Sequence, residues 1–435
     1  MQKLLELFKN KHKELFTALL IVIPLFPKFP ALDIANTYVN IRLEDFLILF
    51  SLIYFLPLVF KNIKVLFNNK VIQSMLIYLF VGLISLIAGI FLTQTVISNV
   101  GMLHLVRRIE YFSLFVIGFL FIYINKKRGI FEYIIKVLLL INLVIFLYGI
   151  GQRYFNLPVI ITQNSEYSKG IALRWVSGAH INSTFAGHYD MASYLVLTLP
   201  LFIATFFKKN INKTTKIIVG VSIAFGFWLL SSAVSRISII SFGVATTVTL
   251  LLLKKYKEIV IIGAISLLVF GFSPDLRVRY KRIFDVVREK ISQVVVVYAA
   301  ESGESKVVED RSTSIRLVVE WPRAIRALEK NPILGTGYSS ITLATDNDYL
   351  RALGETGTLG LVSFLMIFVC IYLYLKKCKF GNGYKSIFIA GFVGSTIAIS
   401  ITAIFIDIFE SSKFAIYYWL TAGIVVGSVL KNKRK

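Results

Sequence analysis

The amino-acid sequence predicts an all-α, polytopic membrane protein with about twelve transmembrane helices and a large helical loop outside the membrane. Three observations support this fold class. The 435 residues have a mean hydropathy of +0.74, and 56% of them are hydrophobic. Apolar runs long enough to cross a bilayer, which takes roughly 20 residues per helix, recur about twelve times. Lysine and arginine cluster in every second loop.

The predicted spans divide the chain into three regions. Residues 1–272 would form an N-terminal bundle of about nine spans, residues 273–353 an extracytoplasmic loop, and residues 354–435 a C-terminal bundle of about three spans. A loop of this length is expected to fold on the membrane surface, with an amphipathic helix over 276–291 and an acidic linker over 301–310. The individual spans are expected near residues 17–30, 45–60, 72–92, 109–124, 131–150, 189–207, 215–230, 237–253, 258–272, 354–375, 386–406 and 414–430.

The net charge of +24 is mostly a topology signal. The loops expected to be cytoplasmic carry 26 basic and 4 acidic residues, whereas the rest of the chain carries 22 basic and 20 acidic residues. An excess of positive charge on the inner side places both termini in the cytoplasm and the large loop outside the cytoplasmic membrane. Because position accounts for the basic excess, we expect membrane lipids as partners and no nucleic acid.

The two sides also differ in the kind of base. The inner side has 24 Lys and 2 Arg, and the outer side has 7 Lys and 15 Arg. A planar guanidinium is better suited than an ammonium to bind carboxylates or phosphates. Two interpretations stay open: the outer arginines pair with the outer acidic residues, or some of them bind an anionic substrate.

The longest polar interval, residues 311–360, contains most of the candidate site. Its first half predicts a helix with Trp321 on the apolar side, which Pro322 should kink. Asn331-Pro332 should end this helix, and Gly335 and Gly337 should form a tight turn. A polar cluster then precedes the tenth span: Asp346, Asn347, Tyr349 and Glu355. For Asp346 both a catalytic base and a helix cap are possible.

Outer arginines and one histidine complete the candidate residues. Arg236 follows a very short outer connection, so it is held near the bilayer surface, where an unpaired charge is costly and an anion would be favoured. Arg107 and Arg108 lie at the outer end of the fourth span and fit an anionic lipid headgroup or a lipid diphosphate. In the loop over 151–188, Arg174 is a substrate-binding candidate. His188 either snorkels to the interface or lines the site.

No motif indicates a metal or a cofactor. The chain has no Walker loop, no zinc-ligand spacing and no Ser/His/Asp arrangement, and we expect neither a metal nor a cofactor. Cys370 and Cys378 are the only cysteines, and their positions indicate no disulfide.

An ordered set of motifs resembles the bacterial O-antigen ligase and O-antigen polymerase superfamily. The set consists of Ser235-Arg236 after a span, Arg316-x4-Trp321, Asn331-Pro332-x-x-Gly335-x-Gly337, Asp346-Asn347-x-Tyr349-Leu350 and Glu355-x-Gly357-x-x-Gly360. Each motif alone is weak, but their order and predicted topology are fairly specific. The segments 107–111 and 181–190 also look like members of this superfamily.

The resemblance implies a GT-C-like membrane glycosyltransferase. Such enzymes move a glycan from an undecaprenyl-diphosphate donor to a glycan or lipid acceptor on the outer face of the membrane, without a metal. The family's conserved arginines carry over to Arg236 and Arg316 as diphosphate-binding residues. Ligases typically have a His-Asn pair where this chain has Asp346-Asn347, and this difference favours a polymerase over a ligase. Asp346 is the first candidate for the catalytic base and His188 the second.

The remaining candidates would bind substrate: Arg107, Arg108, Arg174, Trp321, Asn347, Tyr349 and Glu355. Trp175, Trp321, Tyr338 and Tyr349 could stack on sugars. A polysaccharide-lipid transporter or flippase is the alternative of another class, since it would also be polytopic and could hold arginines. Transporters usually show internal repeats and charged or broken mid-membrane helices, whereas polar residues here gather at the outer face. A structural or assembly protein would leave the Arg and Lys asymmetry unexplained.

Overall fold

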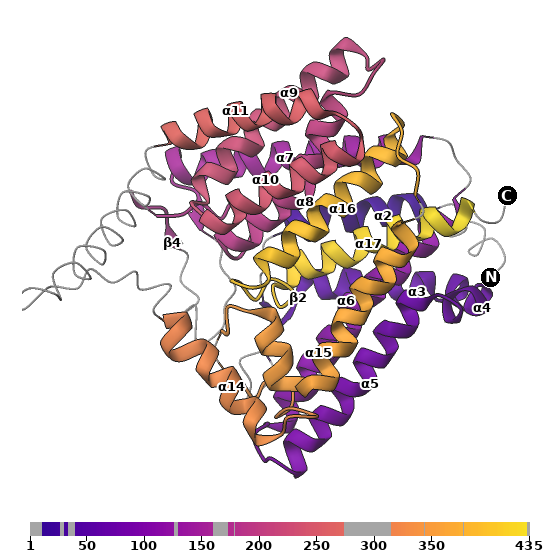
Figure 1. Cartoon of the computed structure of the whole chain (residues 1–435), viewed down its shortest axis with the longest axis vertical. Helices are drawn as coiled ribbons and strands as arrows, with labels where there is room; N and C mark the ends of the chain where they lie inside the picture. The colour runs from indigo at the N-terminus through magenta and orange to yellow at the C-terminus, as the bar shows by residue number, and fades with distance from the viewer. Residues whose placement is uncertain are drawn as a thin grey trace, which may run out of the picture.

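The computed structural model describes residues 11–26, 30–33, 40–125, 129–159, 173–177, 179–273, 315–342, 344–376 and 378–432. These parts of the chain are almost entirely helical (Figure 1). Two short antiparallel ribbons accompany the helices: β1 (Pro30–Asp33) with β2 (Asn40–Arg42), and β3 (Pro158–Val159) with β4 (Leu173–Arg174). The predicted all-α class is therefore confirmed. The loop predictions over 276–291 and 301–310 lie outside the described residues.

Each of the twelve predicted spans coincides with a helix in the described residues. These helices are α2 (His12–Leu25), α3 (Leu43–Lys61), α5 (Lys70–Phe91), α6 (Ser98–Ile124), α7 (Ile130–Tyr154), α8 (His188–Phe206), α9 (Lys213–Ser232), α10 (Arg236–Leu252), α11 (Tyr256–Phe272), α15 (Asp348–Leu375), α16 (Tyr384–Thr402) and α17 (Ser412–Asn432). Eight of them are long and apolar enough to cross a membrane, and α10 is a shorter apolar helix. The count of twelve crossings and the three-region division stay predictions.

Helices α8 and α17 form the centre of the bundle, where their side chains are almost wholly buried. Helix α17 packs along α6, and the two backbones approach very closely. A Cβ atom on Gly423 would lie 2.1 Å from the carbonyl oxygen of Phe115, and one on Gly427 would lie 2.6 Å from that of Phe119. Small residues four apart are typical of such close helix contacts in membranes. Larger side chains at these positions would force the two helices apart.

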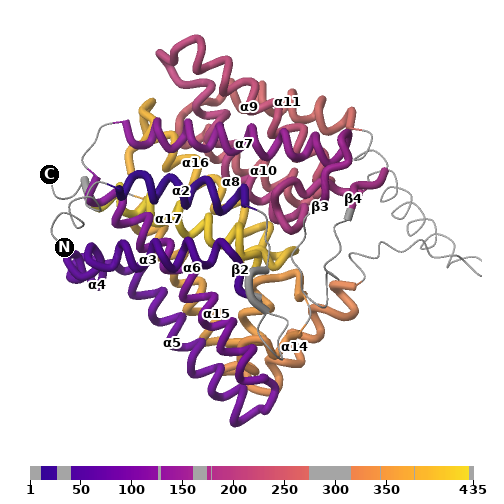
Figure 2. The backbone as a smooth tube through the Cα atoms, turned by 180° about the vertical axis from the view of Figure 1, so that it is seen from behind, coloured from indigo at the N-terminus to yellow at the C-terminus, as the bar shows by residue number. Residues whose placement is uncertain are grey.

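The other helices pack around this centre in two groups. Helix α16 packs on α8 and α10, and α9 packs on α7 and α8. On the opposite side, α5 and α15 run side by side away from the rest of the bundle, as Figure 1 and Figure 2 both show. Helix α14 (Trp321–Lys330), preceded by the π-helical turn η1 (Arg316–Glu320), lies across the outer part of α15. The short α4 (Ile63–Phe67) connects α3 to α5.

Three helix starts differ from the predicted boundaries. Helix α2 begins at His12 rather than near residue 17, α6 begins at Ser98 rather than near 109, and α15 begins at Asp348 rather than near 354. The early turns of α6 and α15 contain charged residues, which lowered the apolar signal there. These charges are accommodated by ion pairs within the protein, described below, so the helices continue beyond their apolar runs.

Candidate functional site

The Asn331–Gly337 turn and a break in α15 form one backbone junction. Gly357 lies inside α15 at φ 68° and ψ −170°, a conformation that is essentially restricted to glycine. Four backbone hydrogen bonds join the two segments: Thr336 to Gly354 (3.0 Å), Gly337 to Glu355 (2.8 Å), Thr358 to Pro332 (2.9 Å) and Leu359 to Ile333 (3.3 Å). The Asn-Pro-x-x-Gly-x-Gly and Glu-x-Gly motifs of the sequence are therefore the two halves of a single structure.

Asn347 caps the start of α15. Its side-chain Oδ1 accepts hydrogen bonds from the backbone amides of Tyr349 and Leu350, at 3.0 Å each, which is the usual role of an N-cap residue. The sequence had left open whether Asp346 is the cap. The cap is Asn347, and the carboxylate of Asp346 binds elsewhere.

Asp346 forms an ion pair with Arg316. One carboxylate oxygen, Oδ2, accepts from both Nε and Nη2 of the guanidinium, at 2.9 and 2.7 Å. The two side chains are 26% and 14% exposed, so the pair is accessible but not fully solvated. Asp346 itself has φ 49°, a left-handed conformation that few non-glycine residues adopt. A strained backbone conformation persists only where the surrounding structure enforces it, and residues in such conformations cluster at functional sites.

The surroundings of the pair shift both pKa values upward. Burial lowers the pKa of Arg316, but the Asp346 carboxylate and the Tyr189 hydroxyl more than offset this effect. Burial raises the pKa of Asp346, and the opposing effect of Arg316 does not cancel it. The pair therefore combines a permanently charged guanidinium with a carboxylate that accepts a proton more readily than a solvated aspartate.

Glu320 lies one turn after Arg316, at the end of the π-helical turn η1, and the sequence analysis missed it. Burial, followed by the nearby charge of Asp346, raises the pKa of Glu320 to about 7. Its Oε2 atom is buried and has no hydrogen-bond partner among the described residues. Single π-helical turns are frequent at functional sites. Pro322, which lacks an amide hydrogen, lies two residues after this turn, and the π-helical turn is the irregularity found near the predicted kink.

The start of α8 lies beside this ion pair. The rings of His180 and His188 stack with centroids 4.1 Å apart, and His188 lies 4.0 Å from the ring of Tyr189, which contributes to the environment of Arg316. The amide of Ile181 donates to Ser232 at 3.1 Å, which ties this loop to the turn before α10. His188 therefore directly precedes Tyr189, the residue that interacts with Arg316.

Arg236 is the first residue of α10 and is half-buried. Ser235 caps the helix, since its Oγ accepts from the amide of Ser238 at 3.3 Å. The Ser-Arg motif therefore combines an N-cap with a guanidinium at the positive end of a helix, which favours anions. That Arg236 and Arg316 bind one diphosphate stays a prediction.

Arg107 and Arg108 are both paired with carboxylates of the protein. Arg107 Nη1 lies 2.9 Å from Asp45 and 3.0 Å from Glu110. Arg108 is buried and forms an ion pair with Glu410, in the connection between α16 and α17. These contacts support the interpretation that some outer arginines pair with outer acidic residues.

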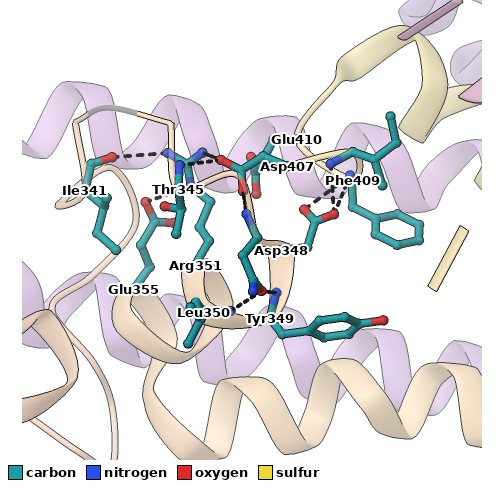
Figure 3. A network of polar contacts seen from close by, with 12 residues as sticks. Ile341, Thr345, Asp348, Tyr349, Leu350, Arg351, Glu355, Asp407, Phe409 and Glu410 are labelled. Atoms are coloured by element: carbon teal, nitrogen blue, oxygen red, sulfur yellow. Dashed lines mark hydrogen bonds and ion pairs between the residues drawn. The ribbon is translucent and has the colours of Figure 1, made fainter. Parts of the chain in front are cut away.

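Glu355 lies deeper, on α15, where it belongs to a second group of charges. It is 2% exposed, and its Oε1 lies 3.6 Å from Nε of Arg351. Arg351 also binds Asp407, with Nη1 2.9 Å from Oδ2 (Figure 3). Glu355 and Arg351 line a buried cavity together with Arg108 and Glu410, and its volume of about 20 Å³ is enough for roughly one water molecule.

The aromatic candidates differ in their access to a substrate. Tyr338 is 1% exposed, so the prediction that it offers a stacking surface is wrong; its ring packs below Arg108, 5.6 Å from the guanidinium carbon. Trp321 is half-buried at the start of α14, and Tyr349 is half-buried with its hydroxyl donating to Ser400 at 2.8 Å. Trp175 is half-buried and donates from Nε1 to the Ala179 carbonyl at 2.9 Å.

Arg174 is exposed at the end of β4, where it binds the carbonyl of Asn156. Within the described residues, no three His, Cys, Asp or Glu side chains converge in a way that could hold a metal ion.

An apolar groove runs between α9 and α11. Its volume is about 750 Å³. Phe206 and Phe207 lie toward one end, and Arg153, Ser231 and Ser232 line the other. The polar end adjoins the turn that leads into α10, so the groove points toward the part of the protein that holds the candidate arginines.

Comparison with known families gives one match. Residues 219–365 match the family described as O-antigen ligase. This segment belongs to the O-antigen ligase family. The match confirms the superfamily that the ordered motifs had suggested. No curated protein matches the chain.

The O-antigen ligase segment begins within α9 and ends within α15, so it contains Arg236, Arg316, Asp346 and Glu320. The apolar helices indicate an integral membrane protein, and its residues 219–365 are similar to O-antigen ligases. His188 and Asp407 lie outside the matched residues and reach the same region through the fold.

Proposed function

We propose that this protein joins lipid-linked oligosaccharide repeats at the extracytoplasmic surface of the cytoplasmic membrane. It would transfer a glycan from a polyprenyl diphosphate, such as undecaprenyl diphosphate, to a hydroxyl group of an acceptor glycan, as an O-antigen polymerase does. The observation that carries the proposal is the partly exposed Arg316–Asp346 pair, with Glu320 and Tyr189 beside it. This arrangement provides a fixed positive charge next to two carboxylates of raised pKa.

The chemistry needs both kinds of group. The acceptor hydroxyl forms a bond to the anomeric carbon of the donor sugar, while the bond from that carbon to the diphosphate oxygen breaks. The electron pair leaves with the diphosphate, and the hydroxyl proton goes to a carboxylate of the site. A guanidinium that is already oriented stabilises the negative charge growing on the leaving group. A carboxylate with a pKa near the working pH is suited to accept the proton.

Arg316 can serve the leaving group without releasing Asp346. A guanidinium has five N–H donors, and Asp346 uses two of them through a single oxygen. Arg236 would add a second guanidinium and the positive end of α10. The apolar groove between α9 and α11 would hold part of the hydrocarbon chain of the donor. No metal is required by this scheme, because the arginines supply the positive charge.

The Asp346-Asn347 pair favours a polymerase over a ligase. The side-chain oxygen of Asn347 accepts two backbone amides as a helix cap, which supports a role for this oxygen in the fold rather than at the acceptor. Of the two residues Asp346 and Asn347, Asp346 is the one whose side chain contacts Arg316. A ligase that transfers the finished glycan to a lipid or protein acceptor is the alternative that uses the same donor chemistry.

A reconstituted assay tests the proposal. The purified protein in phospholipid nanodiscs is given a lipid-linked repeat, and the chain length of the product is read by gel electrophoresis. Arg316→Ala is expected to lower the rate by about 100- to 1000-fold, the usual loss for one oriented donor. Arg326→Ala is the matched control, because Arg326 is exposed on α14. Full activity of the folded Arg316→Ala variant would overturn the proposal.

A deletion strain separates the three possible activities. Accumulation of a single-repeat glycolipid indicates a polymerase. Long chains that stay on the lipid diphosphate indicate a ligase. Repeats trapped on the cytoplasmic leaflet indicate a flippase and would contradict the proposal.

A further inference from the structure

Two turns far apart in the sequence hold each other through their carboxylates. The first turn, residues 345–348, leads into α15, and the second, residues 403–410, connects α16 to α17. Asp407 in the second turn accepts backbone amides of the first, and Asp348 in the first accepts backbone amides of the second (Figure 3). The amide of Asp348 also donates to the carbonyl of Ala403 at 2.9 Å.

Asp407 binds the two residues that flank Asp346. Its Oδ2 accepts from the amide of Thr345, and its Oδ1 accepts from the amide of Asn347, each at 2.8 Å. Both oxygens are therefore engaged, one on either side of Asp346. The backbone of the strained residue between them, at φ 49°, is held through its neighbours, in addition to the contact of its side chain with Arg316.

The charge of Asp407 is balanced by Arg351, whose Nη1 lies 2.9 Å from Oδ2. Arg351 is anchored in turn by the carbonyl of Ile341, at 3.1 Å from Nη2. Such an arrangement keeps a carboxylate ionised and oriented in a poorly solvated place. Asp407 is thus able to accept two amides without having to rotate.

We propose that Asp407 is a positioning residue for the reaction: by holding the amides of Thr345 and Asn347, it keeps the carboxylate of Asp346 directed at Arg316. This inference rests on the proposed role of Asp346. Asp407 does not touch the substrate in this scheme. It acts by preventing the turn from relaxing, and a displacement of a reacting group by about 1 Å can cost about 100-fold in rate.

Asn is a sharp probe at this position. Asp407→Asn keeps the shape of the side chain, but an amide has one acceptor oxygen and one donor nitrogen. One of the two backbone amides would therefore face an N–H group instead of an oxygen. The variant is expected to lower kcat by up to about 100-fold while the KM for the lipid-linked donor stays unchanged.

Asp348→Asn is the matched control. It removes an acceptor for the amides of Ile408 and Phe409, so it weakens the contact between the same two turns. The amides on both sides of Asp346 stay bound to Asp407. A comparable loss of thermal stability is expected, with little change in kcat.

A double-mutant cycle distinguishes positioning from general support of the fold. If Asp407 acts only through Asp346, Asp407→Asn has no further effect on kcat in an Asp346→Asn background. A purely structural role would lower kcat by the same factor in both backgrounds, and that result would overturn the inference. Should Asp407→Asn fail to fold, Arg351→Gln provides the same cycle, because it keeps the carboxylate and removes its anchor.

The failure of this inference and that of the proposed function are separable. Full activity of Asp346→Asn would contradict the proposed role of Asp346. An inactive Asp346→Asn combined with a wild-type kcat for Asp407→Asn would contradict only the positioning role.

Discussion

Arg316 and Asp346 meet across thirty residues of sequence, and the contact is made by two guanidinium nitrogens on a single carboxylate oxygen. Between them lie α14 and the Asn331–Gly337 turn, which is bonded to the break in α15. The geometry of the pair therefore depends on a folded segment rather than on a flexible connection. This makes the pair a defined target for substitution.

Replacing Arg316 by lysine is expected to lower the transfer rate by about 100-fold. An ammonium group keeps the charge but cannot place two donors on one oxygen of Asp346 while presenting others to a diphosphate. The measurement is kcat with a lipid-linked repeat. Arg326→Lys on the exposed face of α14 should be neutral. Equal rates for the two variants would mean that the charge alone matters and not the orientation.

The rate is expected to fall as the pH is lowered through about 7, where Glu320 takes up a proton. Burial and the neighbouring Asp346 charge raise the pKa of Glu320, so its carboxylate is present above this pH and lost below it. Glu320→Gln should remove this limb from the plot of kcat against pH. Glu329→Gln, on the exposed part of α14, should keep it. A limb that survives in Glu320→Gln assigns the titration to another group.

Substitution of Gly357 by alanine is expected to lower the free energy of unfolding by about 1–3 kcal/mol, the usual cost of placing another residue in a backbone conformation that only glycine adopts readily. The added Cβ would also lie 2.2 Å from the carbonyl oxygen of Ile333. Gly243→Ala in α10 is the control, because a Cβ there meets no atom within 4 Å. Thermal unfolding in detergent measures both variants. An unchanged melting temperature for Gly357→Ala would show that the junction can relax.

Loss of Arg108 is expected to unfold the protein rather than to weaken substrate binding. Removing one partner of a buried ion pair costs roughly 3–5 kcal/mol, since the other charge stays buried and unpaired. Arg108→Met should therefore be unstable, and the additional change Glu410→Leu should restore most of the stability. If the double variant is stable and still transfers glycan, Arg108 serves the fold. A stable but inactive double variant would instead support the predicted substrate-binding role.

Filling the groove between α9 and α11 is expected to weaken binding of a long-chain donor. Ala224→Trp narrows a groove of about 750 Å³ and should raise the KM for a polyprenyl-linked repeat about tenfold, equivalent to the loss of about two buried methylene groups. A donor with a short isoprenoid chain should be unaffected. Ile218→Trp, on an exposed part of α9, is the control. Equal KM values for long and short donors in Ala224→Trp would exclude this groove as the site of the lipid chain.

The helices could largely be predicted from the sequence, because apolar runs and basic loops report directly on the membrane. The starts of α6 and α15 could not. Within about three turns of their starts, these helices carry Arg107, Arg108 and Arg351, whose partners Asp45, Glu410 and Asp407 lie about 60 to 300 residues away. Hydropathy is a local property, and it cannot show that a distant carboxylate makes a buried charge tolerable.

The candidate site was predictable where it depends on local sequence. Arg316, Asp346 and His188 were candidates for the site, with a helix cap as the alternative for Asp346 and a snorkelling role for His188. The fold brings Arg316 into contact with Asp346 and close to Tyr189, the sequence neighbour of His188. Glu320 was missed because a glutamate in the middle of a helix rich in basic residues is usually predicted to be exposed to solvent. Asp407 was missed because its role consists of bonds to backbone amides in another turn, which leave no pattern in the sequence.

The glycine break in α15 also anchors the segment that follows Pro322. From Pro332 onward the chain is bonded into the membrane helices, and Ala324 of α14 packs against Gly354. Arg316 and Glu320 lie before Pro322, whereas Asp346 lies after Pro332, in the anchored part of the chain. An opening of the site that displaced η1 would therefore move Arg316 and Glu320 away from Asp346. Access to the candidate site and separation of its opposite charges would then be a single event.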